Sequence, residues 1–217
     1  MTKKSIIKRT QEFVRKTLEG EGTGHDWFHV ERVVRNALKI AEHEGGDKFI
    51  IELSALLHDI ADWKFNEDAN KGSKVARAWL EKLDADQNDI LHVCEIIDTI
   101  SFKGAGVASG MRTTEGKIIQ DADRLDALGA IGIARTFAFN GWKGNQIYDP
   151  RIKPQLHKSF KQYKKSKGTA INHFYEKLLL LKGRINTKTG IKMAVKRHKF
   201  MESYLEQFYE EWSAKET

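Results

Sequence analysis

Apolar residues recur along this chain mostly at intervals of three and four residues, and the strict alternation typical of strands is scarce. This pattern predicts amphipathic helices, which end where glycines such as Gly20 and Gly45 release the backbone. The predicted helices cover residues 5–19, a second segment whose stripe runs from His29 to Ile40, and residues 47–62, 71–83, 86–100, 114–138, 168–181 and 188–213. We therefore expect an all-α fold, formed by the whole chain, 1–217, as a single domain.

Composition narrows the class of protein. The 217 residues can form one substantial core. Lys and Arg exceed Asp and Glu by 37 to 30, and the net charge of +7 favours anionic ligands such as phosphates, nucleic acid or acidic headgroups. The single cysteine, Cys94, cannot form an internal disulfide, and neither a signal peptide nor an apolar stretch near the ~18 residues of a membrane span is present. We expect a soluble, cytoplasmic protein without membrane association.

One apolar run ends abruptly in a polar pair. In "ELSALLHDIAD", residues 52–62, His58 and Asp59 follow a segment that reads as core, where polar groups are costly to bury unless they are satisfied. On a helix Asp62 would lie beside both of them. A lone His-Asp pair at a helix end says little about function, because the histidine can interact favourably with the helix dipole and the aspartate can simply face water.

Two other segments bring similar side chains into otherwise apolar helices. His29 leads the stripe of "HVERVV", and "IIQDADRLDALG" contains Asp121, Asp123 and Asp126. Imidazole and carboxylate donors without a thiolate suit Mn²⁺, Fe²⁺, Co²⁺, Ni²⁺, Zn²⁺ or Mg²⁺. Two histidines and two aspartates fill about four coordination positions and leave one or two for water and a substrate oxygen.

The order of these segments resembles that of the HD-domain metal-dependent phosphohydrolases. The matching elements are "HVERV", "LLHDIAD" and "DADRL", and the HD core covers residues 23–140, with the C-terminal helices packing on it. The resemblance implies a compact helical HD-domain fold and one divalent ion, Mn²⁺ first among the candidates, held by His29, His58, Asp59 and Asp123.

The resemblance also decides between neighbouring candidates. It selects Asp123, directly before Arg-Leu, over Asp121, and it selects His29 over His25, which precedes the helix. His25 is expected beside the ligands, in contact with substrate. A second metal site of the kind some family members have would need His92, Glu95 or Asp98, which depart from that pattern.

The remaining site residues follow from the chemistry of phosphate ester hydrolysis. Asp62 is the candidate catalytic acid or base, one turn beyond the His-Asp pair, and related enzymes have an acidic residue at this spacing. Lys103 and Arg112 flank a glycine-rich loop and are, with His25, the candidate substrate-binding residues.

A longer stretch, "TTEGKIIQDADRLDALGAIGIARTFAFNG", resembles a bacterial branch of small HD hydrolases related to nucleotide pyrophosphohydrolases. The resemblance implies hydrolysis of a nucleoside triphosphate to monophosphate and pyrophosphate. The alternatives are a nucleoside monophosphate phosphatase, a phosphodiesterase, or a metal-containing module that binds nucleotides or RNA without turnover. We expect a nucleotide as partner rather than nucleic acid, and a homodimer is compatible with the sequence.

Overall fold

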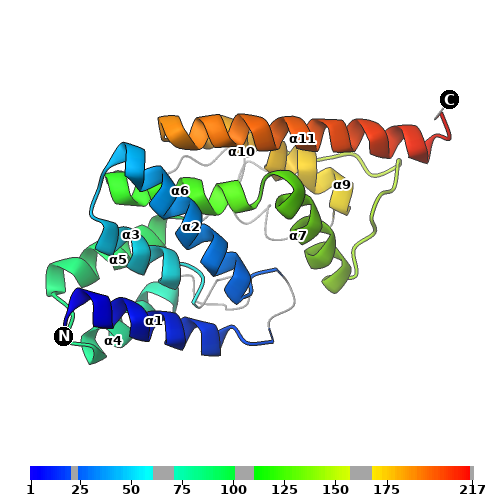
Figure 1. Cartoon of the computed structure of the whole chain (residues 1–217). Coiled ribbons are helices and arrows are strands. Elements are labelled where there is room, and N and C mark those ends of the chain that lie inside the picture. Colours follow the sequence, from blue (N-terminus) through cyan, green and yellow to red (C-terminus); the bar gives the residue numbers. More distant parts are fainter. Residues whose placement is uncertain (21–23, 61–70, 101–109, 157–167, 216–217) are drawn as a thin grey trace. The chain divides into compact units, whose positions relative to one another are not determined.

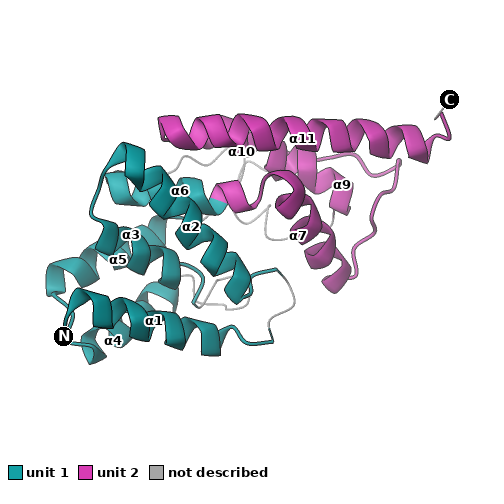
Figure 2. Cartoon of the chain, viewed as in Figure 1, with its two compact units in different colours: residues 1–102, 108–123 teal, residues 103–107, 124–217 magenta. Residues whose placement is uncertain are grey.

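All regular elements in the described part of the chain are helices (Figure 1). The computed structural model describes residues 1–20, 24–60, 71–100, 110–156 and 168–215. The predicted all-α class is confirmed. Within the described residues, every helix is too short or too polar to cross a membrane. The chain divides into two compact units, residues 1–102 and 108–123 in unit 1, and residues 103–107 and 124–217 in unit 2 (Figure 2).

Unit 1 is built around one apolar helix. Its elements are α1 (Lys3–Thr17), α2 (Trp27–Glu44), α3 (Lys48–Leu57), α4 (Lys71–Lys82), α5 (Gln87–Ile100) and the first part of α6 (Thr114–Asp126). Eight of the ten residues of α3 are buried, and α1, α2 and α5 pack against it. Trp79 of α4 stacks on Phe13 of α1, with ring centroids 4.0 Å apart, and donates a hydrogen bond to Thr10. The apolar run before His58 is therefore the centre of this core.

Unit 2 continues from α6 into a second set of helices. It contains α7 (Gly129–Trp142), α9 (Ala170–His173), the π-helix η2 (Phe174–Leu178), α10 (Leu179–Leu181), the 3-10 turn η3 (Lys182–Arg184) and α11 (Lys188–Trp212). Tyr204 of α11 stacks on Phe174 at a centroid distance of 5.8 Å and meets Phe137 of α7 edge to face. These aromatic contacts join α7, η2 and α11 into one core.

The predicted helix over residues 114–138 is wrong, because the chain turns between α6 and α7. The amides of Ala127 and Leu128 bond three residues back, which closes α6, and Gly129 takes a φ of +74°, a conformation that glycine adopts without steric cost. The apolar spacing runs through the turn, so it does not reveal the break.

The helix predicted for 47–62 also ends earlier, as α3 stops at Leu57 and residues 58–60 form a turn. The boundary between the units falls after Asp123, inside α6, and the single domain over 1–217 stays a prediction.

Gly132 is required by the close approach of α7 to the turn that precedes it. A Cβ at this position would lie 2.2 Å from the carbonyl oxygen of Ala127, a backbone atom. We expect Gly132→Ala to lower the free energy of unfolding by about 1–3 kcal/mol, because the overlap outweighs the gain in helix propensity. Gly141→Ala on the same helix is the control, since a Cβ added there would meet nothing within 4 Å, and it should cost no stability. Urea unfolding of both variants measures the difference in stability. Equal unfolding midpoints for Gly132→Ala and Gly141→Ala would contradict the steric argument.

Candidate metal centre

His29 reaches the interior of unit 1 from the first turn of α2. The carboxylate of Asp26 caps this helix by accepting a hydrogen bond of 2.8 Å from the backbone amide of His29. The imidazole of His29 is fully buried, and its Nε2 lies 3.2 Å from Nε2 of His58. The N-cap therefore fixes the start of the helix at the point that directs His29 inward.

His58 stands directly after the apolar helix α3, and its tautomer is set by the backbone. Its Nδ1 lies 2.8 Å from the carbonyl oxygen of Ala55, which can only accept, so Nδ1 carries the proton. In a neutral imidazole Nε2 then presents a lone pair. That nitrogen points at the same place as Nε2 of His29, which is the arrangement that metal-binding histidines have when a carbonyl holds the other ring nitrogen.

Two carboxylates complete the group. Oδ2 of Asp59 lies 3.3 Å from Nε2 of His29 and 3.5 Å from Nε2 of His58. Oδ1 of Asp123, on α6, lies 3.6 Å and 3.9 Å from the same two nitrogens. The four side chains come from α2, the turn after α3, and α6, and all belong to unit 1.

These atoms fit the donors of one divalent ion. Donors about 2.1 Å from a common ion are about 3.0 Å apart at a right angle and about 3.4 Å apart at the tetrahedral angle. The five separations above, 3.2–3.9 Å, are close to those values. Lone pairs and negative oxygens repel one another in a buried space unless a cation or protons lie between them. The donor set, two nitrogens and two oxygens, suits a borderline or hard divalent cation.

His25 contacts the group from outside α2. Its Nδ1 lies 2.8 Å from Oδ2 of Asp59 and must donate, because a carboxylate only accepts. Such a bond orients a ligand carboxylate and leaves its other lone pairs for a cation. His25, His29 and Asp59 also form a second group close enough to hold an ion, and it shares two residues with the set above.

The environment keeps Asp59 ionised. Burial raises the pKa of this carboxyl, but His58 and His25 beside it hold that pKa well below its ordinary value. The carboxylate form is the one that coordinates a cation. Both the ionised state of Asp59 and its position beside the two histidine nitrogens therefore suit a metal ligand.

Other residues singled out in the sequence lie elsewhere. Asp121 is buried outside both candidate ligand groups, Asp126 accepts a hydrogen bond of 3.0 Å from Arg135 within unit 2, and Arg112 is exposed just before α6. His92 lies 3.7 Å from Glu115, a pair that includes neither Glu95 nor Asp98. Asp62 and Lys103 lie outside the described residues.

Two features that position the candidate ligands were not predicted from the sequence. Asp26 reads in the sequence as half of a second His-Asp pair, although an aspartate directly before a helical stripe is an N-cap signal. The carbonyl of Ala55 that orients His58 has no signal in the sequence, because any residue supplies a carbonyl.

Known proteins share both the motif and the fold. The HD domain family model matches residues 27–128. YpgQ of Bacillus subtilis (strain 168) is 36% identical over 201 residues, which make up 92% of this chain and 90% of YpgQ. The crystal structure of YpgQ in complex with ADP has a TM-score of 0.72 at 33% identity, over 94% of this chain and 97% of that one.

Two further crystal structures cover nearly the whole chain. A protein from Lactobacillus plantarum is 36% identical, with a TM-score of 0.89, over 99% of this chain and all of its own. An HD-superfamily hydrolase from Bacillus thuringiensis is 46% identical, with a TM-score of 0.75, over 98% of this chain and all of its own. Sequence, fold and comparisons agree that this chain belongs to the HD superfamily of metal-dependent phosphohydrolases.

Proposed function

We propose that this enzyme hydrolyses nucleoside triphosphates to the monophosphate and pyrophosphate, with His29, His58, Asp59 and Asp123 holding one divalent ion, Mn²⁺ first among the candidates. The observation that carries the proposal is the convergence of the four donor atoms, with separations of 3.2–3.9 Å between the histidine nitrogens and their neighbours. When bound, the ion lowers the pKa of a water and polarises a phosphoryl oxygen.

The protein's own contribution is to hold these donors in their required protonation states. The carbonyl of Ala55 keeps the proton of His58 on Nδ1, and His25 donates to Asp59 and restrains it. The Asp123 side chain is 34% exposed, whereas that of His29 is fully buried, so substrate approaches from the side of Asp123. The buried histidines close the opposite side to water, which strengthens the electrostatic interactions there.

The substrate class that one relative supports is a nucleotide. YpgQ was crystallised in complex with ADP, and this chain's excess of cations suits a phosphate chain. In the proposal, His25, Lys103 and Arg112 contact the substrate, and Asp62 transfers a proton to or from the attacking water or the leaving oxygen. The roles of Asp62 and Lys103 rest on the sequence alone.

The reaction is tested by identifying its products. Metal-stripped protein is reloaded with Mn²⁺, Mg²⁺, Co²⁺ or Ni²⁺ and given nucleoside tri- and monophosphates, with orthophosphate and pyrophosphate detected separately. We expect pyrophosphate and monophosphate in equal amounts, and fastest release with Mn²⁺. Orthophosphate from monophosphates would instead assign a phosphatase, and nucleotide binding without turnover under every metal would assign a binding module.

A further inference from the structure

Glu115, in the first turn of α6, joins that helix to the start of α3. Its Oε1 accepts a hydrogen bond of 2.9 Å from the backbone amide of Asp47, the N-cap residue of α3. The contact is close, because a Cβ on Gly46 would lie 3.1 Å from the same oxygen. Every residue except proline supplies such an amide, so the bond depends on the side chain at position 115 and not on the side chain at position 47. The two helices are therefore joined at their N-terminal ends.

The same two segments meet again at the metal centre. His58 follows the last residue of α3, and its Nε2 lies 3.9 Å from Oδ1 of Asp123 on α6. Contacts at both ends mean that α3 and α6 run side by side in the same direction, and Asp123 stands about 12 Å along α6 from Glu115. The positions of His58 and Asp59 relative to Asp123 thus depend on how far α6 lies along α3.

The axial position of α6 against α3 matters because a metal site tolerates little error. Donor atoms must lie within about 0.2 Å of their preferred distances from the ion. An α-helix is stiff along its axis, so a shift at the N-terminus of α6 reaches Asp123 almost undiminished. Asp123 also stands 3.6 Å and 3.9 Å from the two histidine nitrogens, farther than Asp59 at 3.3 Å and 3.5 Å. A small drift of α6 would therefore take this ligand out of range first.

Two other contacts of α6 lead to a helix that supplies no candidate ligand. Gln120 donates a hydrogen bond of 3.2 Å to the carbonyl oxygen of Ile100, the last residue of α5. His92 of α5 lies 3.7 Å from Oε2 of Glu115, which is longer than a hydrogen bond. These contacts hold α6 against α5, whereas the bond from Glu115 to the amide of Asp47 joins two segments that both lead to ligands.

We propose that Glu115 is a positioning residue of the metal centre, and that its bond to the amide of Asp47 sets the register in which α6 presents Asp123 to the ion. The inference rests on the ligand set of the proposed function and is independent of which phosphate bond is cleaved. The alternative is that Glu115 only stabilises the start of α6, since a negative charge in the first turn interacts favourably with the helix dipole.

Two conservative variants separate the reach of this side chain from its charge. Glu115→Asp keeps the charge but draws the carboxylate back by about 1.5 Å, the length of one carbon–carbon bond, so the bond to Asp47 is lost. Glu115→Gln loses the charge but keeps an Oε1 that accepts the bond. The positioning role predicts a defect in Glu115→Asp and not in Glu115→Gln, whereas a role limited to the helix dipole predicts the reverse order.

Titration of Mn²⁺ into the metal-stripped full chain, followed by calorimetry, measures the effect without depending on turnover. We expect Glu115→Asp and Glu115→Ala to weaken Mn²⁺ binding at least about threefold. This is less than the roughly 10–100-fold that loss of a direct contact to a ligand costs, because Glu115 acts through the helix. Glu115→Gln should bind Mn²⁺ within about 1.5-fold of wild type.

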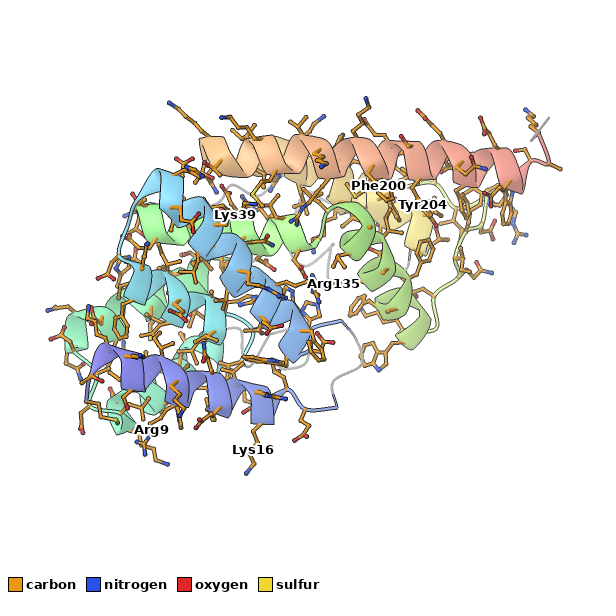
Figure 3. All side chains as sticks on the ribbon, in the orientation of Figure 1. Arg9, Lys16, Lys39, Arg135, Phe200 and Tyr204 are labelled. Carbon is orange, nitrogen blue, oxygen red and sulfur yellow. The ribbon has the colours of Figure 1, made fainter. Side chains whose placement is uncertain are left out.

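Two control variants separate positioning from a general loss of stability. Oδ1 of Asp86 accepts a hydrogen bond of 2.8 Å from the amide of Asn88 at the start of α5, in the same unit. Asp86→Ala should therefore unfold at a lower urea concentration, while its Mn²⁺ affinity stays within about 1.5-fold of wild type. Lys16→Ala, at an exposed position near the end of α1 (Figure 3), should change neither quantity.

Three results would overturn the inference. They are wild-type affinity in both Glu115→Asp and Glu115→Ala, a defect in Glu115→Gln as large as that in Glu115→Asp, and an equal loss of affinity in Asp86→Ala, which would assign the effect to general loosening. A wild-type chain that binds no Mn²⁺, Mg²⁺, Co²⁺ or Ni²⁺ would overturn the proposed ligand set as well. Wild-type binding that no change at position 115 affects would leave that ligand set standing.

Discussion

Replacing Asp59 with alanine is expected to weaken metal binding by more than about 100-fold and to reduce hydrolysis to background. Removing a contact to a ligand commonly costs roughly 10–100-fold in metal affinity, and loss of the ligand itself should cost more. Asp59 lies within 3.5 Å of both histidine nitrogens, and its carboxylate is the group to which His25 donates. Elemental analysis after dialysis, together with titration of Mn²⁺ into stripped protein, measures the effect.

A matched control separates this effect from a loss of fold. Asp47→Ala removes the carboxylate that caps the other end of the same helix, α3, and lies outside the candidate ligand groups. It should lower stability by about 1 kcal/mol and leave the metal content unchanged. Full metal occupancy and normal turnover in Asp59→Ala would remove this residue from the proposed ligand set.

Replacing Asp62 with asparagine is expected to lower kcat by roughly 10²–10⁴-fold, the usual contribution of a positioned acid or base. The amide preserves the shape of the side chain but cannot take up the proton. Metal content and substrate affinity should be retained, because Asp62 is not among the proposed ligands. Single-turnover rates and binding calorimetry on the same variant measure the two effects separately.

The alternative role of Asp62 is to steady His58 or to face solvent. That role predicts a small rate loss, accompanied by weaker metal binding if Asp62 supports a ligand. Asp98→Asn is the matched control, since it is an exposed aspartate on α5 of the same unit, and its kcat should not change. A kcat of Asp62→Asn within about threefold of wild type would end the catalytic assignment.

The fold class could be predicted because most of the core is periodic in the sequence. The stripe of α2 and the apolar run of α3 both mark faces that are buried in unit 1. The break between α6 and α7 could not be predicted this way. Leu125, Leu128 and Ile133 are all buried on either side of the turn, so the apolar spacing continues through it, and only the φ of Gly129 and the approach of Gly132 to Ala127 distinguish two helices from one.

The candidate ligands could be named from the sequence, but the distances between their donor atoms could not be predicted from it. His29, His58, Asp59 and Asp123 carry the right donors and match a family pattern, but spacing within a sequence gives no distance between helices. The tertiary structure places their donor atoms 3.2–3.9 Å apart and adds His25 on Asp59.

The sequence by itself determined the helical class of this protein, the family of its motif and the donors available to a metal. These properties depend on side-chain chemistry and on the local periodicity of the helix, both of which are present in the order of residues. Only the tertiary structure decided which lone pairs face one another and which nitrogen of His58 carries the proton. The first property depends on contacts between residues far apart in the chain, such as His29 and His58, which form only when the core packs. The second depends on the turn after α3, which places the Ala55 carbonyl 2.8 Å from Nδ1 of His58.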